Sequence, residues 1–301
     1  MNSAPKLPIR TIRMDMTGLR GAVFGVVNAK SIGYDLVEYA RSCGAEITLH
    51  CRRQDTVDKL KRLCAPIGVE HVYFGDVEKS GEMDACFDNF AKHGDYDFVL
   101  HCIAGSNPEE MQRPQFEVTR ENFLHTMEVS AYSFQLIAQR MAPLMPRGGG
   151  MVALSYRASV HPFPNYNVMG DAKATLEAIG RRAAYYLGER GIWVIVVRTS
   201  AKESLSSRAI GNRKLIGLLE RANSLRGGRA TRDQIKQGLA AFLTIDMGMT
   251  GREVDLDNGA GVPGMFHPRN AEIIERLGHD VATVRNGGKA EFPPDYFNWD
   301  E

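Results

Sequence analysis

Short apolar runs alternate along this chain with longer segments of helical periodicity. Apolar runs predict strands near residues 22–24, 45–50, 70–74, 98–103, 150–155, 193–197 and 253–256. Helical periodicity predicts helices near residues 31–42, 80–92, 120–143, 165–188 and 231–244, and a charged helical stretch that ends at about residue 64. Strands separated by long helices indicate parallel βαβ units wound on both faces of one sheet.

The alternation continues to about residue 260, which favours one domain over two. We therefore expect a single α/β domain over residues 17–265, with a parallel, doubly wound sheet, after an N-terminal tail of residues 1–16. The segment 266–301 changes character and ends in glycines, a Pro-Pro pair and several aromatic residues. This extension either clasps a groove on the domain or is partly disordered.

The composition is that of an ordinary globular protein, at 301 residues, 44% hydrophobic and 24% charged. The net charge of +1 gives no reason to expect nucleic acid or a charged membrane as a partner. No run approaches the ~20 apolar residues of a membrane helix. The five cysteines lack the spacing of a disulfide framework or a zinc site. We therefore expect reduced thiols, no metal and a cytoplasmic location.

The turn after the first predicted strand has features of a dinucleotide site. Gly25 can supply a tight turn, Gly33 close helix packing, and Ser31 a hydroxyl near a phosphate. The spacing differs from G-x-G-x-x-G. A glycine turn after a strand is also common in proteins where it has only a structural role.

The second predicted strand ends at Arg52 and Arg53. Residues at this position usually contact the adenosine ribose and so discriminate between NAD and NADP. Arginine suits the 2′-phosphate of NADP, whereas an acidic residue would bind the ribose of NAD. We therefore expect NADP(H) to be favoured over NAD(H); the alternative is two solvated surface arginines. Asp76, after the third strand, could bind the adenine amine or cap the next helix.

Tyr166 and Lys173 are seven residues apart, so they share one face at the start of a predicted helix. An ammonium beside a phenol would lower the pKa of the phenol and prepare it for proton donation. The same lysine could hold the nicotinamide ribose. A surface tyrosine–lysine pair is the alternative.

The residues around this pair carry a family resemblance. The segment P-N-Y-N-V-M-G-x-A-K-A at 164–174, with Ser155-Tyr156 upstream, resembles the enoyl-acyl-carrier-protein reductases. These are divergent members of the short-chain dehydrogenase/reductase superfamily. The glycine turn with Ser31-Ile32 and the segment 119–134 are similar to the same family. The resemblance covers roughly residues 18–262 and implies a Rossmann fold with a helical substrate lid at about 205–226 and a C-terminal extension.

The resemblance also implies roles for individual residues. Tyr166 would be the catalytic tyrosine, Lys173 the ribose-binding lysine and Tyr156 a second active-site tyrosine. The cofactor site would comprise Gly25, Ser31, Ile32, Gly33, Arg52, Arg53, Asp76, Val77, Ile103, Ala104, Lys173 and Ser204. The substrate site would comprise Ser106, Tyr156, Met169 and Leu205.

The implied reaction is reduction of the C=C bond of a trans-2-enoyl thioester, linked to acyl carrier protein or coenzyme A. It would serve fatty acid or related acyl or polyketide biosynthesis. Tyr166 would hydrogen-bond the thioester oxygen as that oxygen becomes an enolate. The resemblance further implies a homotetramer or homodimer.

The chain departs from the family after the strand at 193–197. The family reads S-A-G-P-I-R-T where this chain reads R-T-S-A-K-E-S over residues 198–204, so the Gly-Pro turn is lost. A misplacement of about 1 Å can cost on the order of a hundredfold in rate. Asn258-Gly259 likewise replaces a Gly-Gly pair.

Two other functions therefore stay open. One is a short-chain reductase acting on another C=C or C=O substrate, which the altered 198–204 loop would suit. The other is a non-catalytic NADP-binding or scaffold paralogue, against which the intact Tyr156, Tyr166 and Lys173 set argues.

The predicted lid contains an approximate apolar helical stripe with basic residues between its members. In the resembled family this stretch is a mobile lid over the substrate. We expect Arg208, Arg213 and Lys214 to face solvent and to meet an acidic acyl carrier protein. We also expect this segment to be the most mobile ordered part of the domain. An ordinary amphipathic surface helix is the alternative.

Overall fold

Seven parallel strands form one sheet in the order β3-β2-β1-β4-β5-β6-β7. The computed structural model describes residues 13–111, 113–163, 165–200, 213–263 and 275. The strands are β1 (Arg20–Phe24), β2 (Glu46–Cys51), β3 (His71–Phe74), β4 (Phe98–His101), β5 (Gly149–Ser155), β6 (Ile192–Thr199) and β7 (Arg252–Leu256). The predicted α/β class with a single parallel sheet is confirmed.

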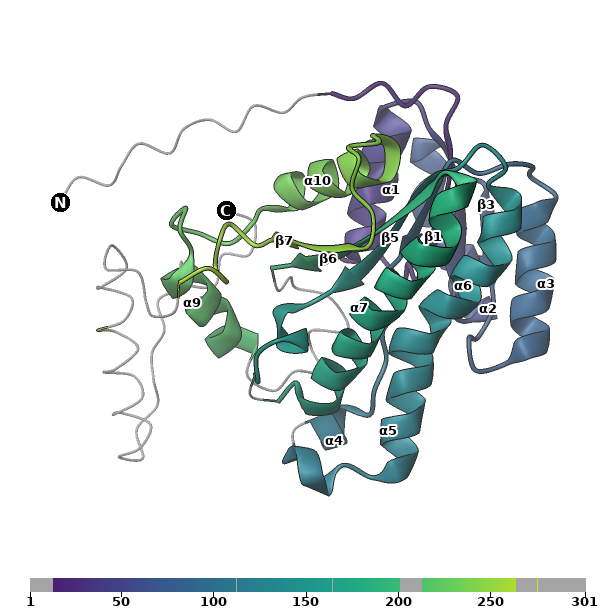
Figure 1. The fold of residues 1–301 in the computed structure, drawn as a ribbon. Coiled ribbons are helices and arrows are strands. Elements are labelled where there is room, and N and C mark those ends of the chain that lie inside the picture. Colours follow the sequence, from purple (N-terminus) through teal and green to yellow (C-terminus); the bar gives the residue numbers. More distant parts are fainter. Residues whose placement is uncertain (1–12, 112, 164, 201–212, 264–274, 276–301) are drawn as a thin grey trace.

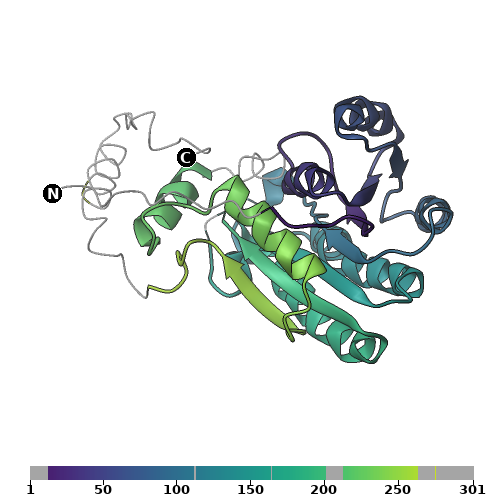
Figure 2. The ribbon, with the colours of Figure 1, turned by 90° about the horizontal axis from the view of Figure 1, so that it is seen from above.

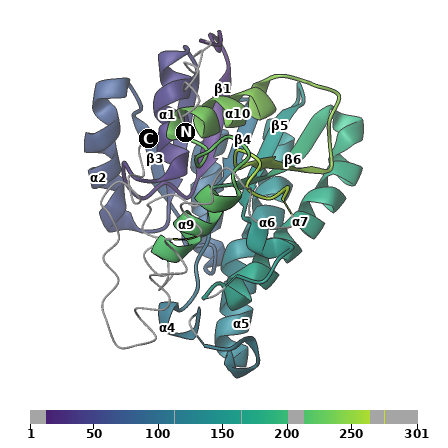
Figure 3. The ribbon, with the colours of Figure 1, turned by 90° about the vertical axis from the view of Figure 1, so that its left-hand side faces the viewer.

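Helices cover both faces of the sheet (Figures 1 and 2). One face packs against α1 (Ile32–Ser42), α2 (Gln54–Cys64) and α10 (Arg232–Thr244). The other packs against α3 (Ser80–Ala91), α6 (Ser133–Met141) and α7 (Asn167–Leu187), with α5 (Arg120–Met127) leading into α6. The four-residue helix α4 (Pro108–Met111) and the helix α9 (Arg213–Asn223) lie near the carboxyl ends of the strands (Figure 3).

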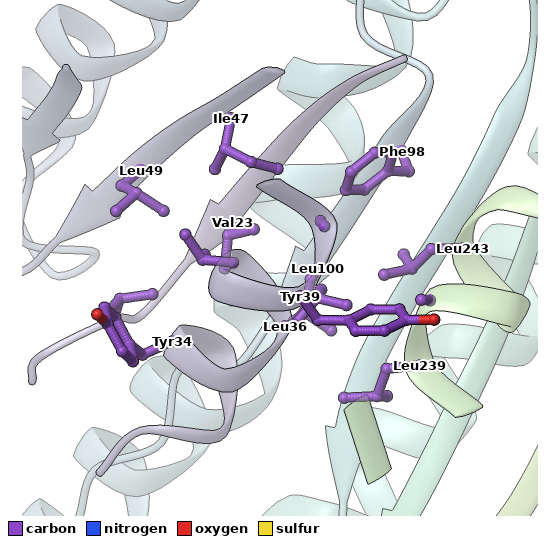
Figure 4. Close-up of a cluster of buried hydrophobic side chains, with 14 of the residues drawn as sticks. Val23, Tyr34, Leu36, Tyr39, Ile47, Leu49, Phe98, Leu100, Leu239 and Leu243 are labelled. Atoms are coloured by element: carbon purple, nitrogen blue, oxygen red, sulfur yellow. The ribbon is translucent and has the colours of Figure 1, made fainter. Parts of the chain in front are cut away.

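Apolar side chains from the sheet and its helices form a continuous core on each face. Figure 4 shows the α1 and α10 side, where Val23 and Leu49 of neighbouring strands meet Leu36 of α1 and Leu239 of α10. All four side chains are fully buried. Strands of a parallel sheet are buried on both faces and therefore consist mainly of apolar residues. For this reason the apolar runs in the sequence predicted their positions.

The predicted helix over 120–143 is broken into two α-helices by a π-helical segment, Glu128–Tyr132. A π-helical turn holds one more residue than an α-helical turn, so apolar periodicity does not reveal it. Ser130 in this segment accepts a hydrogen bond from the Gly105 backbone N–H and donates one to the Gly105 carbonyl, both at 3.0 Å. The π-helical segment thereby fixes the loop that follows β4.

Several predictions fall on residues outside the described part of the chain. These are Ser204, Leu205, Arg208, the start of the lid and nearly all of the extension 266–301. The helix α9 is described, but the side chains of Arg213 and Lys214 are not. Within the described ranges, no helix is long and apolar enough to cross a membrane.

Candidate active site

The order of the strands reverses between β1 and β4. In open α/β sheets, the carboxyl ends of the strands at such a reversal form the crevice in which ligands bind. Gly25 follows β1 there with a φ of 98°. A Cβ at this position would lie 2.8 Å from the Cys102 carbonyl carbon and 2.9 Å from the Ile103 nitrogen. Only glycine therefore lets the two loops after β1 and β4 lie this close together.

The start of α1 completes one side of the crevice. The Ser31 hydroxyl accepts hydrogen bonds from the Val27 and Asn28 backbone N–H groups, each at 3.2 Å, and so shapes the turn before the helix. Gly33 packs against Cys102, whose Sγ would be 2.8 Å from an added Cβ. Ile32 is partly buried against the core.

Both arginines after β2 are engaged by carboxylates. Arg52 binds Asp76 Oδ2 through Nε at 2.9 Å and Glu78 Oε2 through Nη2 at 3.1 Å. Arg53 binds Asp55 at 3.1 Å. Their charges are thus already balanced by local acidic groups.

Asp76 is buried beside Val77, at the carboxyl end of β3. It is not a helix cap, because α3 begins at Ser80 with Lys79 as its N-cap residue. The carboxylate of Asp76 instead binds Arg52 and accepts a hydrogen bond from the Glu78 N–H at 3.3 Å. The capping alternative for this residue is therefore wrong.

A separate apolar cluster lies beyond the ends of β4 and β5. Tyr156 and Met169 are buried in it together with Met111 and Ala172. Tyr166 packs at its margin, with its ring centroid 5.1 Å from that of Tyr156. The structure therefore brings the two predicted active-site tyrosines and the predicted substrate residue Met169 together.

Tyr166 is the N-cap residue of α7, so its backbone is not yet helical. Burial of its hydroxyl raises the pKa of Tyr166, and no ammonium contributes to that shift. The expectation that Lys173 lowers the pKa of Tyr166 is therefore wrong for this structure. A raised pKa keeps the phenol protonated at neutral pH, as a hydrogen-bond donor requires.

Lys173 lies almost fully buried two turns into α7. Its Nζ donates to the Leu154 carbonyl of β5 at 2.9 Å. Burial lowers the pKa of Lys173 to about 8, opposed by the nearby Cys102 and Glu177. The surface-pair alternative fails because this lysine is not on the surface.

A buried ion pair behind Lys173 was not predicted. Glu177 binds Arg198 at 2.6 Å, and its Oε1 also accepts a hydrogen bond from the Ser155 hydroxyl at 2.7 Å. Glu177 lies four residues after Lys173, on the same helix face, which was a usable signal. Arg198, the first residue of the altered loop, thus joins β6 to α7.

The loop after β4 carries further predicted site residues. Ile103 and Ala104 are partly buried, Ile103 against the core beside α6 and Ala104 against the tyrosine cluster. The Ser106 hydroxyl accepts from Thr126 at 2.8 Å and is 3.3 Å from Asn122 Oδ1. Ser106 is thus held by α5.

The substituted Asn258-Gly259 pair keeps the backbone shape that two glycines would allow. Asn258 has a φ of 57° and Gly259 a φ of 74°. Asparagine is one of the few other residues that adopt this left-handed conformation readily. Its side chain also donates to the Gly228 carbonyl at 3.2 Å, which holds the segment before α10.

Comparison with known proteins identifies the family of this fold and site. A family model described as enoyl-(acyl carrier protein) reductase matches residues 25–261. The chain belongs to this family. The predicted resemblance and the prediction of an oxidoreductase are both confirmed.

Individual enoyl-acyl-carrier-protein reductases are similar over most of the chain. One from Rhizobium meliloti, named as an NADH enzyme, is 33% identical over 83% of this chain and 94% of its own length. One from Staphylococcus aureus, named as an NADPH enzyme, is 33% identical over 79% and 94%. The crystal structure of the reductase from Anaplasma phagocytophilum in complex with NAD has a TM-score of 0.81 and 31% identity, covering 85% of this chain and 98% of that one.

The expectation that NADP(H) is favoured over NAD(H) is contradicted. Relatives from Rhizobium meliloti (two), Synechocystis, Nostoc and Rickettsia conorii are named as NADH enzymes. The structure gives a physical reason, because Arg52 and Arg53 are paired with Asp76, Glu78 and Asp55. A 2′-phosphate would have to compete with these carboxylates for the guanidinium groups.

Proposed function

We propose that this protein reduces the C=C bond of trans-2-enoyl thioesters on acyl carrier protein in fatty acid synthesis, with NADH as the reductant. The observation that carries the proposal is the packing of the Tyr166 ring against the Tyr156 ring in an apolar cluster, with Lys173 buried two turns into the helix that Tyr166 caps. This arrangement lies at the strand ends of a chain that belongs to the enoyl-acyl-carrier-protein reductase family.

The crevice between β1 and β4 fits a nicotinamide dinucleotide. Gly25 leaves room at the switch point, and α1 begins there with its N-terminus, which favours a phosphate group. We propose that Ser31, Ile32 and Gly33 would hold the pyrophosphate, and Asp76 with Val77 the adenosine end. Ile103 and Ala104 would line the nicotinamide half, and Lys173 would hold its ribose. When bound, NADH supplies the hydride that the β-carbon of the substrate accepts.

Tyr166 would act on the thioester oxygen. A tyrosine phenol is protonated at neutral pH, and burial raises the pKa of Tyr166 further. It can therefore donate a hydrogen bond as negative charge develops on that oxygen, and a bond that strengthens in the transition state accelerates the reaction. The cluster around Met111, Met169 and Phe163 supplies apolar surface for the acyl chain.

A homo-oligomer is part of the same proposal. Tyr185 and Tyr186 of α7 are 79% and 74% exposed, and Phe123 and Leu124 of α5 are also exposed. Exposed aromatic and aliphatic side chains of this size are surfaces that a second copy could bury. Light scattering should give the mass of a dimer or tetramer, and a Tyr185→Lys/Tyr186→Lys variant should be smaller.

The function can be tested by following NADH oxidation with a short trans-2-enoyl thioester and, separately, with a 3-ketoacyl thioester. We expect oxidation only with the enoyl substrate. Tyr166→Phe should bind NADH as the wild type does and should lower kcat about 100-fold, the loss typical of one donor to an oxyanion. Activity only with the ketoacyl substrate would replace this function with that of a carbonyl reductase.

A further inference from the structure

The hydroxyl of Tyr156 is bound by a residue that lies outside the site predicted from the sequence. Tyr156 follows β5, and its Oη donates a hydrogen bond to Glu220 Oε1 at 2.9 Å. Glu220 belongs to α9, 64 residues further along the chain. Both residues are only 6% exposed, so the contact is a buried one between the end of the sheet and a helix beyond it.

A cation lies on the far side of the same carboxylate. Arg229 Nε is 3.7 Å from Glu220 Oε2, and the side chain of Arg229 is 13% exposed. A buried carboxylate is costly unless it is paired with a cation and hydrogen-bonded. Arg229 and Tyr156 together meet this requirement, so the three side chains form one buried polar chain.

The ring of Tyr156 is held from two further sides. Its centroid is 5.3 Å from that of Phe163 and 5.1 Å from that of Tyr166, with interplanar angles of 57° and 56°. The position of a tyrosine ring depends on two side-chain torsions, and the hydrogen bond to Glu220 fixes the far end of this ring. Because Tyr166 precedes the first turn of α7, the wall formed by Tyr156 helps to set the direction of the Tyr166 ring.

The contact with Glu220 also gives the hydroxyls of Tyr156 and Tyr166 different hydrogen-bonding roles. A phenol has one proton, and that of Tyr156 is directed at Glu220. Burial, together with the negative charge of Glu220, raises the pKa of Tyr156. Tyr156 is therefore committed to its carboxylate in this arrangement, and the hydroxyl of Tyr166 is left to meet a substrate oxygen.

We propose that Glu220, supported by Arg229, is a positioning residue for reduction: it holds Tyr156 as the wall against which Tyr166 is oriented, and it ties α9 to the end of β5. This inference rests on the proposed function, since orientation of Tyr166 matters only if Tyr166 assists the reaction. The tie between α9 and β5 can be tested without any activity.

The kinetic test is a double-mutant cycle with Glu220→Ala and Tyr156→Phe, which keeps the ring but removes the hydroxyl. We expect Glu220→Ala to lower kcat about 10- to 100-fold, the factor that corresponds to a hydrogen bond to a charged group. The dissociation constant for NADH should change by less than about twofold. The double variant should be no slower than the slower single variant, because both substitutions remove the same contact.

Two further variants separate positioning from general structural damage. Glu220→Gln keeps an acceptor oxygen for Tyr156, and it should recover most of the kcat lost in Glu220→Ala. Glu253→Gln is the matched control: Glu253 is also paired with an arginine, Arg181, but lies on β7 away from the tyrosine cluster. It should leave kcat unchanged. An unchanged kcat in Glu220→Ala, or losses that multiply in the double variant, would overturn the positioning role.

Hydrogen exchange supplies the activity-independent arm. If the tie exists, Tyr156→Phe should speed amide exchange in α9 while leaving α10 as in the wild type. Equal exchange in α9 of the variant and the wild type would overturn the tie. The proposed function would be refuted, and the contact would not, if amide exchange in α9 changed as expected but no enoyl thioester supported NADH oxidation.

Discussion

At the scale of single residues, Lys173 shows a conflict between stability and function. Its ammonium is buried, and burial lowers the pKa of Lys173 from its unfolded value to about 8. A lowered lysine pKa favours folding only at high pH, and this contribution is lost as the pH falls towards 8. At neutral pH the charged lysine therefore destabilises the folded protein.

Replacing Lys173 with Met should consequently stabilise the protein while removing its activity. Methionine is similar in length and has no charge to bury, so we expect the free energy of unfolding to rise by about 1–3 kcal/mol. Urea denaturation at neutral pH measures this change, and NADH binding and turnover should both be impaired. A variant that is less stable and fully active would show that Lys173 has only a structural role.

Sequence reasoning located the residues of the site better than it located their partners. Gly25, Tyr166 and Lys173 could be placed at the strand ends because local spacing and the order of elements decide such positions. The ion pairs of Arg52 with Asp76 and of Arg198 with Glu177 join residues more than 20 positions apart. Only the packed sheet brings these charges together, so the cofactor preference inferred from Arg52 and Arg53 was wrong.

At the scale of elements, the π-helical segment between α5 and α6 holds the loop that lines the crevice. Ser130 satisfies both the N–H and the carbonyl of Gly105. Ser130→Ala would leave these backbone groups without that partner, at a cost of about 1–3 kcal/mol. We expect weaker NADH binding in titrations, whereas the exposed Ser80→Ala should bind as the wild type does. If Ser130→Ala bound NADH as tightly as the wild type, this loop would not contribute to cofactor binding.

The regular elements were predictable, and the irregular ones were not. The strands were found because apolar runs of this length are buried on both faces. The helix α4 has only four residues, too few to show a period, and the π-helical segment is held by side-chain contacts such as that of Ser130 with Gly105. Hydrophobic periodicity along the sequence cannot predict such elements, because the contacts that stabilise them form only in the folded protein.

At the scale of the whole molecule, two buried histidines make stability depend on pH. His50 and His101 lie in one row across β2, β1 and β4, on either side of Phe24. Burial lowers the pKa of His50 to about 4 and that of His101 well below its usual value. Both histidines therefore stabilise the fold above an unfolded pKa of about 6.5, and this contribution is lost as the pH falls.

His50→Gln tests this dependence. We expect the advantage of the wild type over the variant to shrink by about 2 kcal/mol from about pH 7 to about pH 5. The exposed His161→Gln is the control and should show no such change. Urea unfolding at the two pH values measures both. A constant difference between the wild type and His50→Gln would mean that His50 titrates normally in the folded protein.

The central claim is that the described site performs conjugate reduction with NADH. The most direct measurement is the fate of a hydride label: deuterium-labelled NADH is incubated with a trans-2-enoyl thioester on acyl carrier protein, and the product is examined by mass spectrometry. We predict a saturated acyl thioester with deuterium on the β-carbon, formed about 100-fold more slowly by Tyr166→Phe. Deuterium on a carbonyl-derived alcohol carbon, or an unlabelled and unreduced enoyl thioester, would contradict the account.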